Sequence, residues 1–335
     1  MPLDIETRFL GLADFEPAAR EVLPHAVYEF IAGGAGDEIT KRDNEAAFDR
    51  IKLRQRVLRD VTRLDTAITL FGQRLPHPII LAPIAYRRLA HPEGEVAAAR
   101  GAGVAGAVFI VGTTATAAIE DCLAESQSPV WFLLYWQSDR SFNGELVSRM
   151  AALGAKAISV TVDLPKRQAI AAGKFRAGFK MPDSIATPYF KDRNTGVLNV
   201  GTAQKRAMPT WADIAWLRSL TTLPLILKGI LDPDDAEQAI GTGADAIVVS
   251  NHGSRNLDTL PAAIDALPAI AERVAGRIPI GATAVMIGRP YVYALATAGA
   301  EGVAHCVNLL RRDFEMAMAL TGRARIGEID RSVIW

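Results

Sequence analysis

The segment RIPIGATAVMIGRP, residues 277–290, determines how many strands the sheet of this chain can contain. Its two halves, residues 277–280 and 284–289, each have the short, continuous apolar character of a strand that is buried on both faces. Only Gly281, Ala282 and Thr283 lie between them. Two parallel strands of one sheet need a crossover of about a dozen residues or more. The question is therefore which fold contains both strands, and what became of the crossover.

Similar apolar runs recur along the chain with helical patterns between them. They cover residues 77–84, 107–112, 130–136, 157–163, 224–229 and 246–252. Asp232 followed by Pro233 predicts a helix N-cap with proline at the first helical position. Eight strands alternating with helices predict an α/β fold, a (β/α)₈ TIM barrel. A doubly wound sheet is the alternative, and it is disfavoured because no G-x-G-x-x-G follows the first strand.

Two segments fall outside this alternation. Residues 1–60 have helical periodicity, and we expect them to form a helical cap on a barrel made by residues 61–335. Residues 164–206 form a long loop after the fourth strand, at the carboxyl face where barrels carry their active sites. Loops of this length are usually functional, so we expect a lid.

Composition narrows the class of protein. The 335 residues are half hydrophobic, and 37 basic residues balance 37 acidic ones, so nothing favours a nucleic-acid partner. The two cysteines, Cys122 and Cys306, lie far apart and suggest a reducing compartment without disulfides. We see no signal peptide, no apolar run long enough to cross a membrane and no metal-binding spacing such as H-E-x-x-H. The sequence predicts a soluble, cytoplasmic protein that binds no metal.

Polar residues follow several of the predicted strands. Ser250, His252 and Arg255 come directly after residues 246–249, and Gly253 allows a tight turn. A histidine in this position suits a general base, and an arginine suits a carboxylate. Lys228 ends another strand. The structural alternatives are a hydrogen-bonded histidine beside a surface arginine, and a lysine that simply reaches solvent.

Two further strand ends carry candidate residues. Gly288 and Arg289 follow the last strand, where barrels often bind phosphate. Asp163 ends the fourth strand, where it is placed either to pair with a cation or to cap the loop that follows.

Six stretches in collinear order resemble the family of FMN-dependent 2-hydroxy-acid oxidases and dehydrogenases, which includes glycolate oxidase, lactate oxidase and mandelate dehydrogenase. They read AGGAGDE, LAPIAYRRLAHPEGEVAAARGAG, LLYWQSDR, LPLILKGI, VVSNHGSRNLD and IGRPYVYALA. The resemblance runs from about residue 14 to the last residue. It implies a (β/α)₈ barrel with FMN at its carboxyl face, a small-molecule substrate and a homotetramer.

The resemblance implies roles for individual residues. His252 is similar to the base that takes the proton of the substrate 2-hydroxyl, and Asp163 to the aspartate that orients it. Arg255 and Tyr135 resemble substrate-binding residues, and Phe30 occupies a third substrate position. Lys228 resembles the lysine that stabilises the reduced flavin. The cofactor contacts implied in this way are Lys228, Thr161, Ser250, Gly288, Arg289, Ala82 and Ile84.

The chain departs from the family at several polar positions. The family usually has tyrosine at Phe30, threonine at Ile84 and Leu164, and glutamine at Leu133. A second carboxylate-binding arginine, expected near residues 170–172, is absent. These changes predict an apolar pocket that suits an aromatic or bulky 2-hydroxy acid.

The resemblance implies that a DGG-(I/V)-R-x-G phosphate loop and a helix connect the seventh strand to the eighth. Either this protein lacks both, or the sequence leaves out residues between Ile280 and Gly281. A missing loop also keeps open two alternative functions: a degenerate member without flavin that acts as a structural or regulatory partner, and a barrel repurposed for other chemistry.

Overall fold

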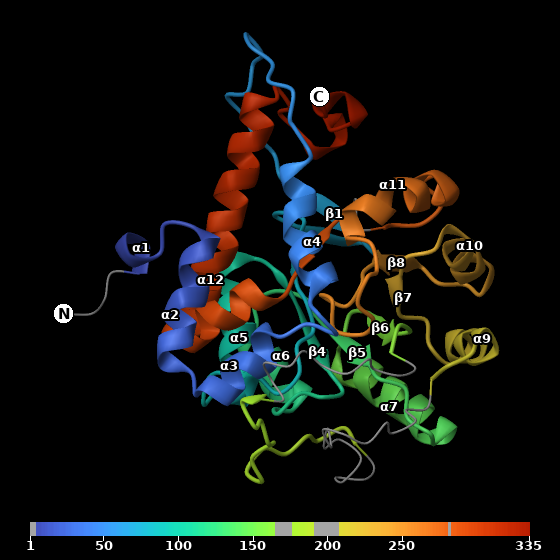
Figure 1. Ribbon diagram of the computed structural model, residues 1–335. Coiled ribbons are helices and arrows are strands. Elements are labelled where there is room, and N and C mark those ends of the chain that lie inside the picture. Colours follow the sequence, from blue (N-terminus) through green and yellow to red (C-terminus); the bar gives the residue numbers. More distant parts are fainter. Residues whose placement is uncertain (1–4, 165–175, 191–207, 281–282) are drawn as a thin grey trace.

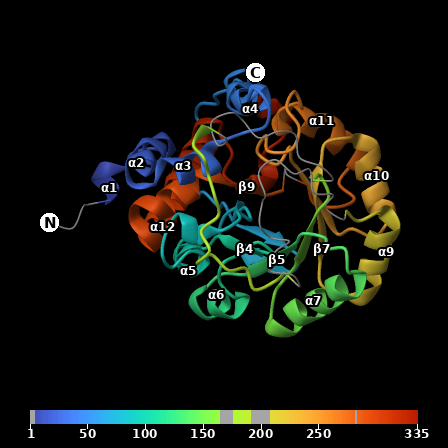
Figure 2. The same ribbon diagram turned by 60° about the horizontal axis from the view of Figure 1, so that its bottom comes forward.

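The computed structural model describes residues 5–164, 176–190, 208–280 and 283–335. Its main feature is a curled parallel sheet whose first and last strands, β3 and β9, pair with each other (Figures 1 and 2). The strands are β3 Ile79–Leu81, β4 Val108–Gly112, β5 Val130–Leu134, β6 Ile158–Thr161, β7 Leu225–Ile230, β8 Ala246–Val249 and β9 Val285–Ile287. They lie in the order β8-β7-β6-β5-β4-β3-β9. The predicted TIM-barrel type of fold is confirmed.

Helices surround this sheet, as Figure 2 shows. They are α5 Glu95–Ala105, α6 Ile119–Glu125, α7 Arg140–Leu153, α9 Trp211–Leu220, α10 Pro233–Gly241, α11 Ala263–Val274 and α12 Arg289–Leu320. Every residue of β4, β5 and β6 is buried, because helices cover the outer face and side chains fill the inner one. The predicted cap at Asp232 is confirmed, since its side chain accepts a hydrogen bond from the amide of Asp234.

Residues 5–49 are largely helical, as predicted. They form α1 Ile5–Arg8, η1 Leu12–Asp14, α2 Phe15–Val22, α3 His25–Ala32 and α4 Ile39–Asp49. Helix α2 packs on α12, and α4 packs on α11. A hairpin of β1 Ile68–Leu70 and β2 Gln73–Leu75 follows, and its Phe71 packs against Trp131 of β5. The division of the chain into cap and barrel at residue 60 stays a prediction.

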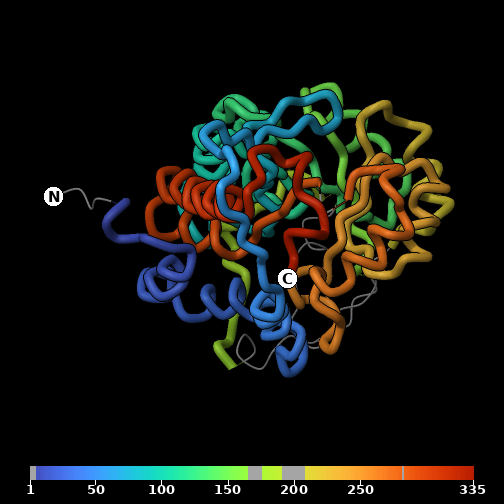
Figure 3. The backbone as a smooth tube through the Cα atoms, turned by 90° about the horizontal axis from the view of Figure 1, so that it is seen from above, coloured from blue at the N-terminus to red at the C-terminus, as the bar shows by residue number. Residues whose placement is uncertain are grey.

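Short 3₁₀ turns complete the described elements. They are η2 Arg87–Leu89, η3 Ile326–Glu328 and η4 Arg331–Val333. The last two belong to a C-terminal segment that lies beside the chain after α4, as Figures 1 and 3 show, with a bridge between Leu53 and Ile334. Within the described ranges, none of the helices is both long and apolar enough to span a bilayer.

The predicted strand at residues 277–280 is wrong. This segment carries no strand, although the amide of Ile247 on β8 donates to the carbonyl of Pro279 (3.2 Å). The amide of Thr283 donates to the carbonyl of Ile280 (2.8 Å), so the chain has no crossover at this point. Without a crossover, residues 277–280 cannot join the ladder in the same direction as β9. In the described part of the chain the sheet therefore has seven strands and stays open between β8 and β9.

The predicted lid lies mostly outside the described residues, which exclude 165–175 and 191–207. The described part, residues 176–190, contributes two buried aromatic side chains. Phe179 stacks on Phe30 of α3, with 4.5 Å between ring centroids. The hydroxyl of Tyr189 accepts a hydrogen bond from the amide of Ile119 at the start of α6.

Candidate active site

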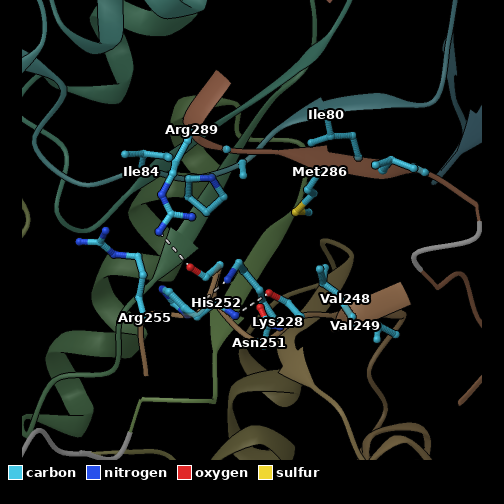
Figure 4. Close-up of a pocket in the computed structure, with 18 of the residues that line it drawn as sticks. Ile80, Ile84, Lys228, Val248, Val249, Asn251, His252, Arg255, Met286 and Arg289 are labelled. Carbon is cyan, nitrogen blue, oxygen red and sulfur yellow. Dashed lines mark hydrogen bonds between the residues drawn. The ribbon is translucent and has the colours of Figure 1, made fainter. Parts of the chain in front are cut away.

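A cavity of about 630 Å³ opens at the carboxyl ends of the strands and continues into the sheet interior (Figure 4). Most of the residues predicted from the sequence for the site line it together, although they come from segments far apart in the chain. They are Phe30, Ala82, Ile84, Tyr135, Lys228, Ser250, His252, Arg255, Gly288 and Arg289. Its size falls in the range of small-molecule sites.

The imidazole of His252 lies at the centre of the polar groups. Its backbone has a left-handed φ of 59°, which non-glycine residues rarely adopt, and its amide donates to Ser250 Oγ (3.0 Å). His252 Nδ1 lies 2.9 Å from Asp163 Oδ1, and Nε2 lies 3.1 Å from Tyr135 Oη. Because a carboxylate only accepts hydrogen bonds, Nδ1 carries the proton. The neutral ring therefore presents Nε2 as an acceptor beside the tyrosine that lines the cavity.

Two buried charges support this histidine. Burial alone would raise the pKa of Asp163, but the hydrogen bond from His252, the positive charge of that ring when it is protonated, and the charge of Lys228 lower that pKa below its ordinary value. Burial lowers the pKa of Lys228, and Asp163 partly opposes this shift. Lys228 Nζ lies 3.4 Å from His252 Nδ1. Asp163, Lys228 and His252 thus form one buried electrostatic unit.

Sequence reasoning missed Asn256 as a member of this site. Its side-chain amide donates to both the backbone carbonyl (3.0 Å) and the carboxylate (3.2 Å) of Asp163. Asn256 thereby fixes the position of Asp163, which in turn orients the ring of His252. A signal existed, because Asn256 lies within the same stretch as His252 and Arg255.

Gly229 makes room for Asp163. Its φ is 116°, and a Cβ built at this position would lie 2.3 Å from the Asp163 carboxyl carbon. No side chain fits at that distance. The glycine after Lys228 is therefore required both for its backbone conformation and for the close approach of the aspartate.

Arg255 and Arg289 lie in the cavity, and both bind the carboxyl end of α3. Arg255 donates to the carbonyls of Phe30, Ile31 and Gly33 at 2.9–3.1 Å. Arg289 donates to the carbonyls of Ile31 and Gly33 and to that of Gly253, each at 3.0 Å. Cations at this end of a helix are favourable. The carboxylate role of Arg255 and the phosphate role of Arg289 stay predictions.

The predicted apolar pocket is only half right. Phe30 and Ile84 line the cavity, but Leu133 and Leu164 do not, because both are packed in the core at 1% exposure. Tyr86, which sequence reasoning missed, joins the apolar wall and packs near Phe30, with 6.2 Å between ring centroids.

Comparison with known proteins shows the family to which this chain belongs. The model of the FMN-dependent dehydrogenase family matches residues 19–335. The chain is 38% identical to a 2-hydroxyacid oxidase of Dictyostelium discoideum, over 98% of this chain and 90% of that protein. It is 38% identical to an L-lactate oxidase of Nostoc, over 97% of this chain and 98% of the relative. The chain belongs to the FMN-dependent dehydrogenase family.

Solved structures agree with this assignment. A crystal structure of mandelate oxidase matches with a TM-score of 0.89 at 37% identity, covering 95% of this chain and 96% of that one. The alignment with the Dictyostelium protein spans 354 residues, more than the 335 of this chain. That relative therefore contains residues without a counterpart here.

The described residues fit the ring of FMN, the cofactor of the family. Thr161 Oγ1 at the end of β6 is buried and has no hydrogen-bond partner among the described residues. Thr161 pairs in register with Lys228 on β7, so a hydroxyl and an ammonium group lie on neighbouring strand ends. Ala82 and Ile84 supply an apolar face. For the phosphate, the structure offers Gly288 and Arg289 at the start of α12, and the sequence leaves only three residues between Ile280 and Ala284 for a phosphate loop.

Replacing Gly229 by alanine should disrupt the site more than the fold. The added Cβ forces Asp163 away from its present position, so His252 loses the acceptor that orients its ring. We expect Gly229→Ala to lower kcat for a 2-hydroxy acid by about 10²-fold or more. Steady-state kinetics measure this loss. Gly154→Ala, at a glycine that also has a left-handed φ but nothing within 4 Å of an added Cβ, controls for backbone strain; equal losses in both variants would contradict the argument.

Asp163→Asn should change how stability depends on pH. Because the folded-state pKa of Asp163 is lowered, its stabilising contribution is present above the ordinary pKa of about 4 and is lost as pH falls through the lower folded-state value. The variant should be less stable than the original chain at pH 7, and this difference should shrink in acid. Urea unfolding at several pH values measures it, with the exposed Asp313→Asn as control. A difference that does not change with pH would rule out the linkage.

Proposed function

We propose that this protein is an FMN-dependent enzyme that oxidises a 2-hydroxy acid to the 2-oxo acid. The observation that carries the proposal is His252, which is oriented by buried Asp163 and presents Nε2 to the cavity beside Tyr135. Its relatives in the same family include oxidases named for 2-hydroxy acids, glycolate and lactate.

The residues of the chain divide the work of the reaction. His252 Nε2 accepts the proton of the 2-hydroxyl group, and Asp163 stabilises the imidazolium that results. Bound FMN supplies the acceptor for the two electrons and the hydrogen that leave C2. Lys228 places a positive charge in the same cavity, where it stabilises negative charge that develops on the acceptor. Arg255, which lines the cavity, binds the substrate carboxylate.

The apolar wall supports an aromatic or bulky substrate side chain. Phe30, Ile84 and Tyr86 line the cavity, and the buried ring of Phe179 stacks on Phe30. Aromatic rings prefer such surroundings. Comparing kcat/KM for glycolate and for an aryl-substituted 2-hydroxy acid tests the idea, and a preference for glycolate would contradict it.

His252→Asn should abolish most of the 2-hydroxy-acid oxidation. Asparagine at this position cannot accept the proton, and the loss of a positioned base costs about 10²–10⁴-fold in rate. Turnover of an aryl 2-hydroxy acid with added FMN measures the effect, and His25→Asn, at an exposed residue at the start of α3, is the control. Turnover of His252→Asn at the original rate would disprove the assignment of the base.

The visible spectrum of added FMN shows whether the original chain binds the cofactor. It therefore distinguishes the proposed enzyme from the alternative of a family member without flavin. Binding should perturb the visible spectrum in both His252→Asn and the original chain, because Lys228 and Thr161 remain. If excess FMN leaves the spectrum of the original chain unchanged, the missing crossover has removed cofactor binding. A structural or regulatory role, or other chemistry, is then the better interpretation.

We also propose that the protein is a cytoplasmic homotetramer. The two cysteines are buried and unpaired, which suits a reducing compartment, and cell fractionation tests the location. Exposed apolar side chains, a feature typical of contact surfaces, gather on the adjoining segments 53–58 and 329–335. They are Leu53, Val57, Leu58, Ile329, Ile334 and Trp335.

The oligomer is tested by mass. Native mass spectrometry at micromolar concentration should give four times the chain mass of 36.0 kDa. Leu58→Ser should shift it toward smaller species, because Leu58 is fully exposed in the single chain. A monomer in the original chain would refute the proposal.

A further inference from the structure

The cavity extends well beyond the polar site at the carboxyl ends of the strands. Its lining includes Ile80, Ile226 and Ala246, which belong to strands of the curled sheet. It also includes Phe48 of α4 and, on α11, Ile264 and Leu267. Both helices belong to the outer layer (Figure 2). The cavity therefore passes through the wall of the sheet, and we call this part, from Ala246 to α4 and α11, the side chamber.

The passage lies at the opening between β8 and β9. On the opposite wall, Val108 of β4 and Ala157 before β6 are fully buried. Val248 of β8 and Met286 of β9, by contrast, are partly exposed, and Val285 is 56% exposed. Figure 4 shows Val248 and Met286 on facing strands with the cavity between them. A closed barrel fills its interior with layers of side chains, and the missing strand leaves that filling incomplete here.

The chemistry of the side chamber is apolar. Aliphatic and aromatic side chains form most of its interior, where Thr283 lies beside Ala284, and α4 contributes the polar residues Lys41, Asn44 and Glu45 at the outer end. Lys41 already pairs with Glu38 (3.3 Å), and Asn44 bonds with Asn251. One cation and one anion at the rim give no preference for a charged ligand. An apolar space of this kind is a poor site for water.

We propose that the side chamber binds the hydrocarbon chain of an uncharged amphiphile, such as a medium-chain alcohol. The chain lies against Ala246, Val248 and Met286, and its single polar group stays at the rim formed by α4. Burial of the chain supplies the binding free energy. This site goes beyond the proposed oxidation, because none of these residues holds the substrate carboxylate or the proton that His252 accepts.

Titration with 1-decanol tests the proposal. Calorimetry on the purified full-length protein should show saturable binding. Ala246→Phe should weaken binding by about tenfold or more, because the phenyl ring takes the space that the chain needs. Ala269→Phe adds the same ring on the exposed side of α11 and should leave the affinity unchanged. Circular dichroism checks the fold of each variant, and Ala284→Phe, on the other side of the passage, replaces Ala246→Phe if that variant does not fold.

Two results would overturn the proposal. One is the absence of decanol binding, or the same affinity in the folded Phe variants as in the original chain. The other is loss of decanol binding when mandelate is saturating, which would place the alcohol at the polar site. Failure of the proposed oxidation can be distinguished from failure of alcohol binding. It would appear as an unchanged flavin spectrum or as missing turnover. It would not alter the comparison of decanol affinity between Ala246→Phe and Ala269→Phe.

Discussion

The short connection between Ile280 and Ala284 is the constraint on which the rest of this structure depends. A parallel strand needs a crossover to return the chain to the same edge of the sheet, and three residues cannot provide one. Residues 277–280 therefore stay outside the ladder, and β8 and β9 remain unpaired with each other. The same missing crossover opens the side chamber and removes the loop that the family places at the cofactor phosphate. One local feature thus alters the sheet, the cavity and the cofactor site together.

The cluster of Asp163, Lys228 and His252 does not depend on that connection. Asp163 and His252 follow the ends of β6 and β8, and Lys228 lies near the end of β7. These three strands pair with one another, with a register shift between Lys228 and Ile230 of β7. Gly229 and Asn256 fix the aspartate by leaving space and by hydrogen bonding. Buried charges are stable only when they are paired, so these residues hold one another in place. This explains how a chain with an open sheet keeps the imidazole of His252 oriented.

The N-terminal helices are connected to the site through two arginines. Arg255 and Arg289 come from segments far apart in the chain, yet both donate to the carbonyls at the end of α3. Phe30, in the last turn of that helix, reaches the cavity between Arg255 and Phe179. The position of α3 therefore sets both the apolar wall and the direction in which the arginines point. A substrate carboxylate that binds Arg255 would compete with the carbonyl groups at the end of α3 for the same guanidinium donors.

Much of the architecture follows from local sequence, because continuous apolar runs and helix caps are short-range signals. The sequence by itself determined the β/α alternation, most strands, the cap at Asp232 and the cluster of polar residues after the strands. The motif around His252 was also sufficient to indicate the family. The tertiary structure alone decided that residues 277–280 form no strand, that Leu133 and Leu164 face the core, and that Asn256 and Gly229 hold Asp163. The physical reason is that an apolar residue can pack in a core or line a cavity equally well, and a strand forms only where a partner lies alongside it. Both depend on contacts between residues that are distant in the chain.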